Sequence, residues 1–230
     1  MLRGSFYDLL RRLCPYRTRQ WFKSQAWFEP LLRIAFGNSV YSKSYYEDVE
    51  RIEAESVRHI SDWIVASLAP RRLMDVGCGP GHLSRALADR GVEVVGVDLS
   101  DEAIRKTSQK GIPASHFDLT KPGVLPGAPY DIVLSCEVAE HLEERYAGGF
   151  VEKLTNAGET IYLTAAEPEP DQGIGMYHFN EQPNAYWIEL MRKSDFELDE
   201  DATRDARMLL ADTSVIAYLA KPMIFRRRAG

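Results

Sequence analysis

The chain has 230 residues, 45% of them hydrophobic and 27% charged, which is typical of a globular domain with room for a small appendage. Its net charge of −6 argues against a protein that binds nucleic acid over a broad surface, and no apolar run is long enough to cross a membrane. The three cysteines, Cys14, Cys78 and Cys136, lie too far apart in sequence to predict a zinc site or a set of disulfides, which favours a reducing, cytoplasmic setting.

Residues 1–40 are basic, with seven Lys or Arg against two Asp or Glu, whereas the rest of the chain is acidic. Their apolar and aromatic side chains follow helical spacing, and Pro15 and Pro30 divide the segment into short helices. We expect residues 1–40 to form a helical extension or lid, and residues 41–230 to form the main domain. A basic amphipathic element that docks a protein partner, a second copy of the chain or a membrane surface is one alternative, and a mobile tail is another.

A helix predicted over residues 41–69 leads into the stretch from Leu73 to Leu83, which is the centre of the predicted site. There an apolar strand ends in Asp75, three glycines follow at alternate positions, and a helix begins at His82. Glycine lets the main chain take positive φ angles and lets a ligand approach it closely, while the first N–H groups of a helix have no partner within the helix. The spacing of the glycines differs from the dinucleotide fingerprint, so the turn predicts a polar ligand other than a pyrophosphate.

Three further strands are predicted to end in polar residues. The second strand ends at Asp98, where a carboxylate is placed to accept hydrogen bonds from ribose hydroxyls, and Ser100 is a suitable cap for the helix that follows. The third strand ends at Asp118, and the fourth runs from Tyr130 to Glu137. Strands alternate with helices along the chain, which favours a doubly wound, mostly parallel α/β sheet with right-handed crossovers.

In the last third of the chain, a strand is predicted at residues 159–165 and a Pro- and Gly-rich loop at 166–182. A helix at 183–194 and two closing strands at 196–199 and 215–221 are predicted to follow. The long loop follows the carboxyl end of a strand, where loops usually carry function. The basic run at residues 226–228 is expected to be a disordered tail.

Together and in this order, the motifs resemble those of the class I S-adenosylmethionine-dependent methyltransferases. The matching residues are the Asp75–Gly81 turn, Gly96–Ser100, Asp118–Leu119 and Asp131–Leu142. The resemblance covers residues 40 to 221, and it implies a seven-stranded sheet with one antiparallel strand and S-adenosyl-L-methionine as cofactor. It also implies methyl transfer to an oxygen or nitrogen of a small molecule, as in natural-product or sugar tailoring.

The same resemblance implies which residues bind the cofactor. Those expected around the methionine part are Asp75, Gly77, Gly79, Ser135 and Cys136. The others are Asp98 at the ribose, Asp118 and Leu119 at the adenine, and Leu99. Tyr45 belongs to a tyrosine-bearing segment that closes over the cofactor in similar methyltransferases, and packing on a helix face is its alternative role.

Transfer to a hydroxyl or an ammonium also needs a base. The four candidates are Glu137, His141, His178 and Glu181. His141 follows the fourth strand, and His178 lies beside aromatic residues in the loop at 166–182, so each is placed to face an acceptor. For His141, holding a loop in place by a hydrogen bond is the alternative. The sequence displays no metal-ligand triad, so no metal is expected.

Two other functions remain open at this point. A protein of this fold that uses the bound sulfonium as a fixed charge, or that catalyses a cyclisation in a biosynthetic pathway, would need carboxylates and a histidine at the same place. A non-catalytic cofactor-binding subunit that docks through residues 1–40 is the third hypothesis.

Overall fold

The computed structural model describes residues 43–168, 178–211, 219 and 221–228, with side chains described from residue 54 onward. The predicted extension at residues 1–40 and the side chain of Tyr45 therefore lie outside the described part of the chain. Among the helices that are described, none combines the length and the apolar character needed to cross a membrane.

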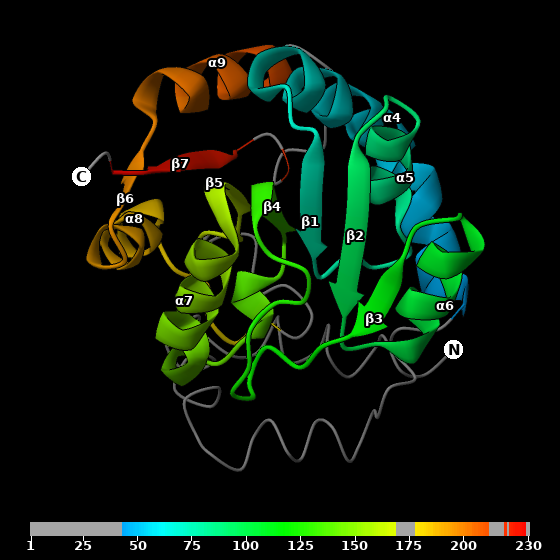
Figure 1. Cartoon of the computed structure of the whole chain (residues 1–230), viewed down its shortest axis with the longest axis horizontal. Coiled ribbons are helices and arrows are strands. Elements are labelled where there is room, and N and C mark those ends of the chain that lie inside the picture. Colours follow the sequence, from blue (N-terminus) through cyan, green and yellow to red (C-terminus); the bar gives the residue numbers. More distant parts are fainter. Residues whose placement is uncertain (1–42, 169–177, 212–218, 220, 229–230) are drawn as a thin grey trace, which may run out of the picture.

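The core is one seven-stranded sheet in the order β3-β2-β1-β4-β5-β7-β6 (Figure 1). Neighbouring strands are parallel except at β7, which runs antiparallel to β5 and to β6. The predicted doubly wound, mostly parallel sheet with one antiparallel strand is thus confirmed. The strands are β1 Arg72–Val76, β2 Glu93–Asp98, β3 Ala114–His116, β4 Tyr130–Cys136, β5 Gly158–Thr164, β6 Phe196–Leu198 and β7 Met223–Arg227.

Helices cover both faces of this sheet, with α4, α5 and α9 on one face and α7 and α8 on the other (Figure 1). The helices are α4 Lys43–Leu68, α5 His82–Ala88, α6 Asp101–Gln109, α7 Ala147–Ala157, α8 Asn184–Lys193 and α9 Glu200–Ala211. Two short 3₁₀ turns, Ala139–His141 and Glu144–Tyr146, follow β4. As expected, Ser100 caps α6, because its hydroxyl accepts a hydrogen bond of 3.3 Å from the N–H of Ala103.

Alternate residues of the central strands supply the two cores. In β1, Leu73 packs in the same cluster as Ile64 of α4, whereas Met74 packs in the cluster that contains Phe150 of α7. All four side chains are buried. A parallel strand buried on both faces is apolar at successive positions, which explains the run that precedes the glycine turn in the sequence.

The carboxyl-terminal part of the chain differs from the prediction. The structure adds a strand, β7, beyond the predicted strand at residues 215–221, most of which lie outside the described part of the chain, and it adds α9, which was not predicted. The side chains of Met223, Ile224 and Phe225 in β7 are fully buried. In the sequence this apolar run is only three residues long and lies between Pro222 and a run of arginines, so it does not have the pattern of a strand. A short buried strand is recognised by the partners on either side of it, and these are distant in sequence.

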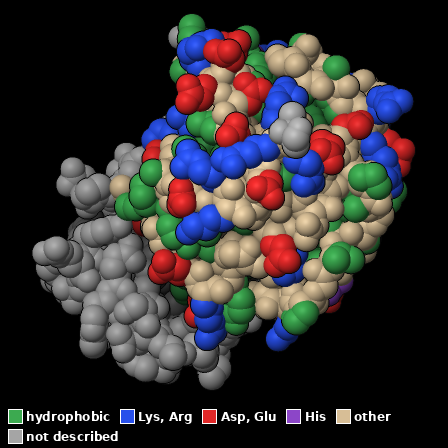
Figure 2. Space-filling view, turned by 60° about the vertical axis from the view of Figure 1, so that its left-hand side comes forward, with side chains coloured by type: hydrophobic (Ala, Val, Ile, Leu, Met, Phe, Trp, Pro, Cys, Tyr) green, Lys and Arg blue, Asp and Glu red, His purple; other side chains and the backbone are tan. Residues whose placement is uncertain are grey.

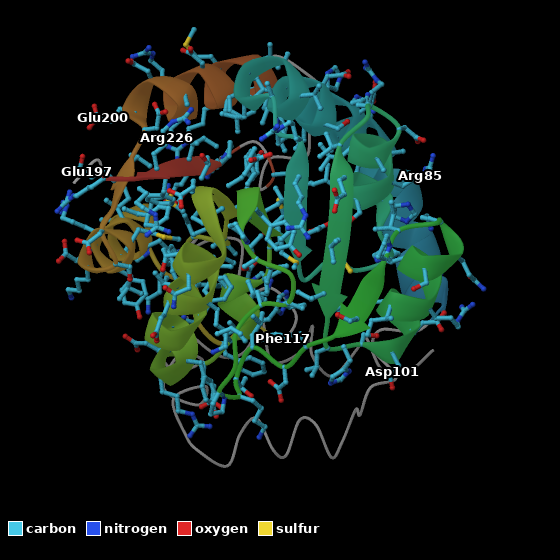
Figure 3. The ribbon with its side chains drawn as sticks, viewed as in Figure 1. Arg85, Asp101, Phe117, Glu197, Glu200 and Arg226 are labelled. Atoms are coloured by element: carbon cyan, nitrogen blue, oxygen red, sulfur yellow. The ribbon has the colours of Figure 1, made fainter. Side chains whose placement is uncertain are left out.

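The basic run at residues 226–228 is not a disordered tail, so that prediction was wrong. Its first two residues belong to β7, and the three arginines pair, in order, with Asp199, Glu159 and Glu197 at 2.6, 2.9 and 2.8 Å. Figure 3 labels Arg226 and Glu197 at this edge of the sheet, and Figure 2 shows acidic and basic side chains interspersed on the face that includes it. The positive charges are therefore matched by acids of neighbouring elements.

Replacing Arg227 by alanine is expected to lower the free energy of unfolding by about 1–3 kcal/mol. Its guanidinium donates to the carbonyls of Thr155 and Gly158 at 2.7 and 3.2 Å and lies 4.7 Å from the ring centre of Phe196. Urea denaturation of the full chain measures the change. Arg228→Ala is the control, because it removes an exposed ion pair and should cost less than about 1 kcal/mol. Equal losses in the two variants would contradict the role given to Arg227.

Candidate functional site

The carboxyl ends of β1, β2 and β4 meet at one edge of the sheet, the lower edge in Figure 1. The register places Asp75 of β1 between Gly96 of β2 and Leu134 of β4. Asp101 and Phe117, which follow β2 and β3, mark the same edge in Figure 3. Ligands of open parallel sheets bind beyond this edge, where the strand order reverses.

The glycine turn after β1 is bare on one side and tightly packed on the other. Gly77 and Gly79 have φ angles of +76° and +53°, and the N–H groups of Gly77 and Cys78 donate to the carbonyl of Val97 at 2.8 and 3.0 Å. A Cβ added at Gly79 would meet nothing within 4 Å, whereas one at Gly77 would lie 2.3 Å from Cγ2 of Val138. The turn thus offers exposed main chain to a ligand and rests on the segment that follows β4.

Two buried acids lie beside this turn. Asp75 is 5% exposed and accepts a short hydrogen bond from the hydroxyl of Ser84. Burial raises the pKa of Asp75 to about 6, a rise that the Ser84 bond opposes and the charge of Asp98 increases. Asp98 accepts from the N–H groups of Gly79 and Ser100 at 2.9 and 2.8 Å, yet burial still raises its pKa. The two carboxyls make this end of the site favourable for a cationic ligand.

The residues predicted at the adenine lie further along the same edge. Leu99, predicted as a further cofactor contact, is 51% exposed. Asp118 accepts from the N–H and the hydroxyl of Thr120 at 2.9 and 2.6 Å, which fixes its carboxylate, and Leu119 packs against the core. Their contacts with an adenine stay predictions.

Ser135 and the cysteines contribute mainly to packing. The hydroxyl of Ser135 is fully buried and donates to the carbonyl of Val76 at 3.2 Å, so it ties β4 to β1. Cys78 and the half-buried Cys136 form no disulfide with any described residue. Burial, and then the charges of the two nearby aspartates, raise the pKa of Cys78 far above its ordinary value, which keeps it a neutral thiol.

An acid and histidine cluster, formed by Glu137, Glu140, His141, His178 and Glu181, lies after β4. Glu137 has a φ of +54°, which is unusual for a residue with a side chain, and its N–H donates to the carbonyl and the hydroxyl of Thr164. Its carboxyl reaches that of the fully buried Glu140, and burial raises the pKa of both. Two buried carboxyls this close cannot both ionise without a compensating positive charge.

The loop beyond the fifth strand brings the remaining members of the cluster. His178 Nδ1 lies 2.9 Å from an oxygen of Glu181, and the rings of His141 and His178 meet edge to face at 4.9 Å. The N–H groups of Phe179 and Asn180 donate to the carbonyl of Glu140 at 2.7 and 3.0 Å, which fastens this loop to the turn after β4.

The structure therefore gathers all four predicted bases in one place, although two of them come from a distant loop. It also adds Glu140, which the sequence analysis did not single out. The available signal was the short spacing Glu137-x-x-Glu140-His141 directly after a predicted strand end, which keeps these side chains near one another.

Comparison with known proteins identifies the fold family. Residues 45–147, which hold β1 to β4 and the glycine turn, match the family model described as a methyltransferase domain. Over these residues the chain is similar to methyltransferase domains. Curated relatives include ubiquinone biosynthesis O-methyltransferases of Nitrosomonas europaea, 34% identical over 89 residues, and of Burkholderia vietnamiensis, 35% identical over 83 residues. The matches cover 36% and 34% of this chain and 38% and 36% of those relatives, so the chain matches well under half of their length.

Solved structures resemble the methyltransferase domain in fold. Magnesium protoporphyrin IX methyltransferase from Synechocystis PCC 6803 has a TM-score of 0.61 at 18% identity, and the match covers 87% of this chain and 100% of that one. The [4+2]-cyclase SpnF has a TM-score of 0.54 at 13% identity, with 75% of this chain and 81% of that one covered. At these identities the likeness concerns the fold alone.

The residues of the methyltransferase domain fit S-adenosyl-L-methionine, which carries a cationic methionine part and a ribose. Among the described residues, Asp75 is bonded to a hydroxyl and to no cation, so its carboxylate is suited to an ammonium. The open space at Gly79 admits a ligand against the main chain, and Asp98 keeps lone pairs for hydroxyl donors. When bound, this cofactor supplies a methyl group activated by its sulfonium.

Proposed function

We propose that the protein transfers a methyl group from S-adenosyl-L-methionine to an oxygen or nitrogen of a small molecule. The observation that supports this proposal best is the contact between the glycine turn and the segment after β4, because an added carbon at Gly77 would touch Val138 at 2.3 Å. The glycine turn, proposed to bind the cofactor, and the acid and histidine cluster are thus adjacent. The relatives named O-methyltransferases favour oxygen as the acceptor atom, and natural-product or sugar tailoring is the setting we propose.

In this proposal the chain orients the two reactants, removes water and accepts a proton. Asp75 and Asp98 hold the cofactor on one side of Val138, and the acid and histidine cluster receives the acceptor on the other. Orientation of two reactants contributes a large part of the acceleration of such a displacement. Glu137 takes the proton of the acceptor hydroxyl or ammonium, because its raised pKa makes it a stronger base than an exposed glutamate at neutral pH.

The test combines cofactor binding with transfer of a labelled methyl group. We expect the full chain to bind S-adenosyl-L-methionine and its demethylated product in isothermal titration, and to transfer label to members of a panel of phenols, amines and sugars. Glu137→Gln should lower the transfer rate by about 10²–10⁴-fold and leave the affinity for the demethylated product unchanged. The control is Glu144→Gln, an exposed acid on the next turn, which should behave as wild type. An unchanged rate in Glu137→Gln would refute the assignment of the base, and a chain that binds neither cofactor form would refute the function.

A cyclisation without methyl transfer is the second candidate. The specific observation that favours it is the buried pair Glu137 and Glu140, because two carboxyls with raised pKa values retain a proton that can be passed to a substrate. The same labelled incubation separates the two functions. A product that contains no label, formed in the presence of bound cofactor, would favour cyclisation.

A further inference from the structure

Three potential metal ligands meet where β4 ends. Glu140, His141 and His178 each offer one ligand atom, and these atoms all lie within 4.8 Å of one another. We propose that Glu140, His141 and His178 bind a divalent transition-metal ion. The sequence did not display this triad, because a separate loop brings His178 to the other two residues.

The carboxylate of Glu140 is the strongest reason to place a cation here. The residue is 0% exposed and its carboxyl lies against that of Glu137, while no well-aligned N–H or hydroxyl among the described residues bonds to either of its oxygens. A buried carboxylate without a donor or a cation is costly, so it is normally paired or bound to a metal. Its main chain is held by Phe179 and Asn180, which fixes the position of the side chain without satisfying it.

The tautomer of His178 and the orientation of the two imidazole rings suit metal coordination. Glu181 accepts from Nδ1 of His178 at 2.9 Å, which selects the tautomer whose Nε2 carries a lone pair for a metal. A carboxylate on the far nitrogen is the usual outer partner of a metal-bound histidine, and it fixes the orientation of the ring. His141 meets this ring edge to face at 4.9 Å, so both imidazoles point to one small volume beside Glu140.

The ligand set indicates the kind of ion. Two imidazoles and a carboxylate suit Zn²⁺, Mn²⁺, Fe²⁺ or Co²⁺, whereas Mg²⁺ and Ca²⁺ prefer oxygen ligands alone. Glu137 lies beside Glu140 and offers a further carboxyl oxygen at the edge of the same site.

Three protein ligands also leave coordination positions open, as in catalytic rather than structural sites. An ion there would bind the acceptor through a hydroxyl oxygen and lower the pKa of that hydroxyl. This use of the ion rests on the proposed methyl transfer, whereas the binding of the ion does not.

The experiment uses Co²⁺ as the probe, because its visible absorption reports the number and type of its ligands. Metal-free full chain is dialysed against Co²⁺, and the bound ion and the spectrum are measured. We expect one Co²⁺ per chain, with an affinity lowered more than about 100-fold by Glu140→Gln or His178→Gln and about 10–100-fold by Glu181→Gln. His59→Gln on α4 is the matched control and should bind as wild type.

Binding of the demethylated cofactor, measured on the same samples, shows that each variant is folded. Wild-type chain that binds this nucleoside but no stoichiometric Co²⁺ would overturn the metal site and leave the proposed function intact. Unchanged Co²⁺ affinity in both Glu140→Gln and His178→Gln would also overturn it. A chain that binds Co²⁺ as expected but transfers no label would instead count against the proposed function, and the metal site would stand.

Discussion

Replacing Gly77 by alanine is expected to abolish measurable cofactor binding and to lower the free energy of unfolding by about 2–5 kcal/mol. Two costs add at this position. A residue with a side chain at a φ of +76° costs about 1–2 kcal/mol in backbone strain. The new methyl group would also lie 2.3 Å from Cγ2 of Val138, and forcing such a contact apart costs about 1–3 kcal/mol. Urea denaturation measures the stability, and isothermal titration with the demethylated cofactor measures the binding.

Gly79→Ala is the matched control for this prediction. Its φ of +53° is also positive, but an added carbon there meets nothing within 4 Å, so only the backbone cost of about 1 kcal/mol applies. The new methyl group would occupy ligand space, so binding should still weaken. A second control, Val138→Ala in the Gly77→Ala background, should recover part of the lost stability. Equal stability losses at the two glycines would show that Val138 does not brace the turn.

The part of the fold that the sequence predicted correctly is the part encoded locally. The strands β1 and β2 are apolar runs with an acid, Asp75 or Asp98, at or next to the last residue, and glycine spacing marks the turn after β1. Each of these signals lies within one element and its neighbour in sequence. They were sufficient to place the carboxyl edge of β1 and β2, where the candidate site lies.

The parts that the sequence did not predict depend on distant partners. Strand β7 is short, and what identifies it is its pairing with β5 and β6, which no local pattern records. The same holds for the acid and histidine cluster, because His178 reaches Glu140 only through main-chain bonds from the residues that follow it. Local patterns thus located the proposed cofactor side, whereas tertiary contacts assembled the proposed acceptor side.

Asp75→Asn is expected to stabilise the chain at pH 8 and to weaken its binding of S-adenosyl-L-methionine. The pKa of Asp75 rises from its ordinary 3.8 to about 6 in the folded chain because the carboxyl is buried. The folded state therefore holds its proton more tightly than the unfolded state. This contribution to stability is fully present below about pH 4 and is lost as the pH rises through about 6, a change of about 3 kcal/mol.

Asparagine has the same shape and carries no charge, so the variant should lack this loss. Urea denaturation of both proteins at pH 5 and at pH 8 isolates the effect, because other titrating groups cancel in the difference between them. The variant should gain stability relative to wild type as the pH rises. At pH 8 its affinity for the cationic cofactor should fall by about tenfold or more, because a charge-assisted hydrogen bond is lost.

The expected gain in stability and loss of cofactor affinity in Asp75→Asn together connect this residue to ligand binding. A buried carboxylate that destabilises the free protein is retained in a sequence when a bound cation compensates for it, and perturbed acids of this kind gather at functional sites. Ser84 donates to this carboxyl with its hydroxyl and would satisfy the asparagine oxygen equally well, so packing gives no reason to require the acid. If Asp75→Asn left cofactor affinity unchanged while raising stability, Asp75 would have no place in the binding site, and the cation would have to be held by Asp98 or by the main chain of the glycine turn.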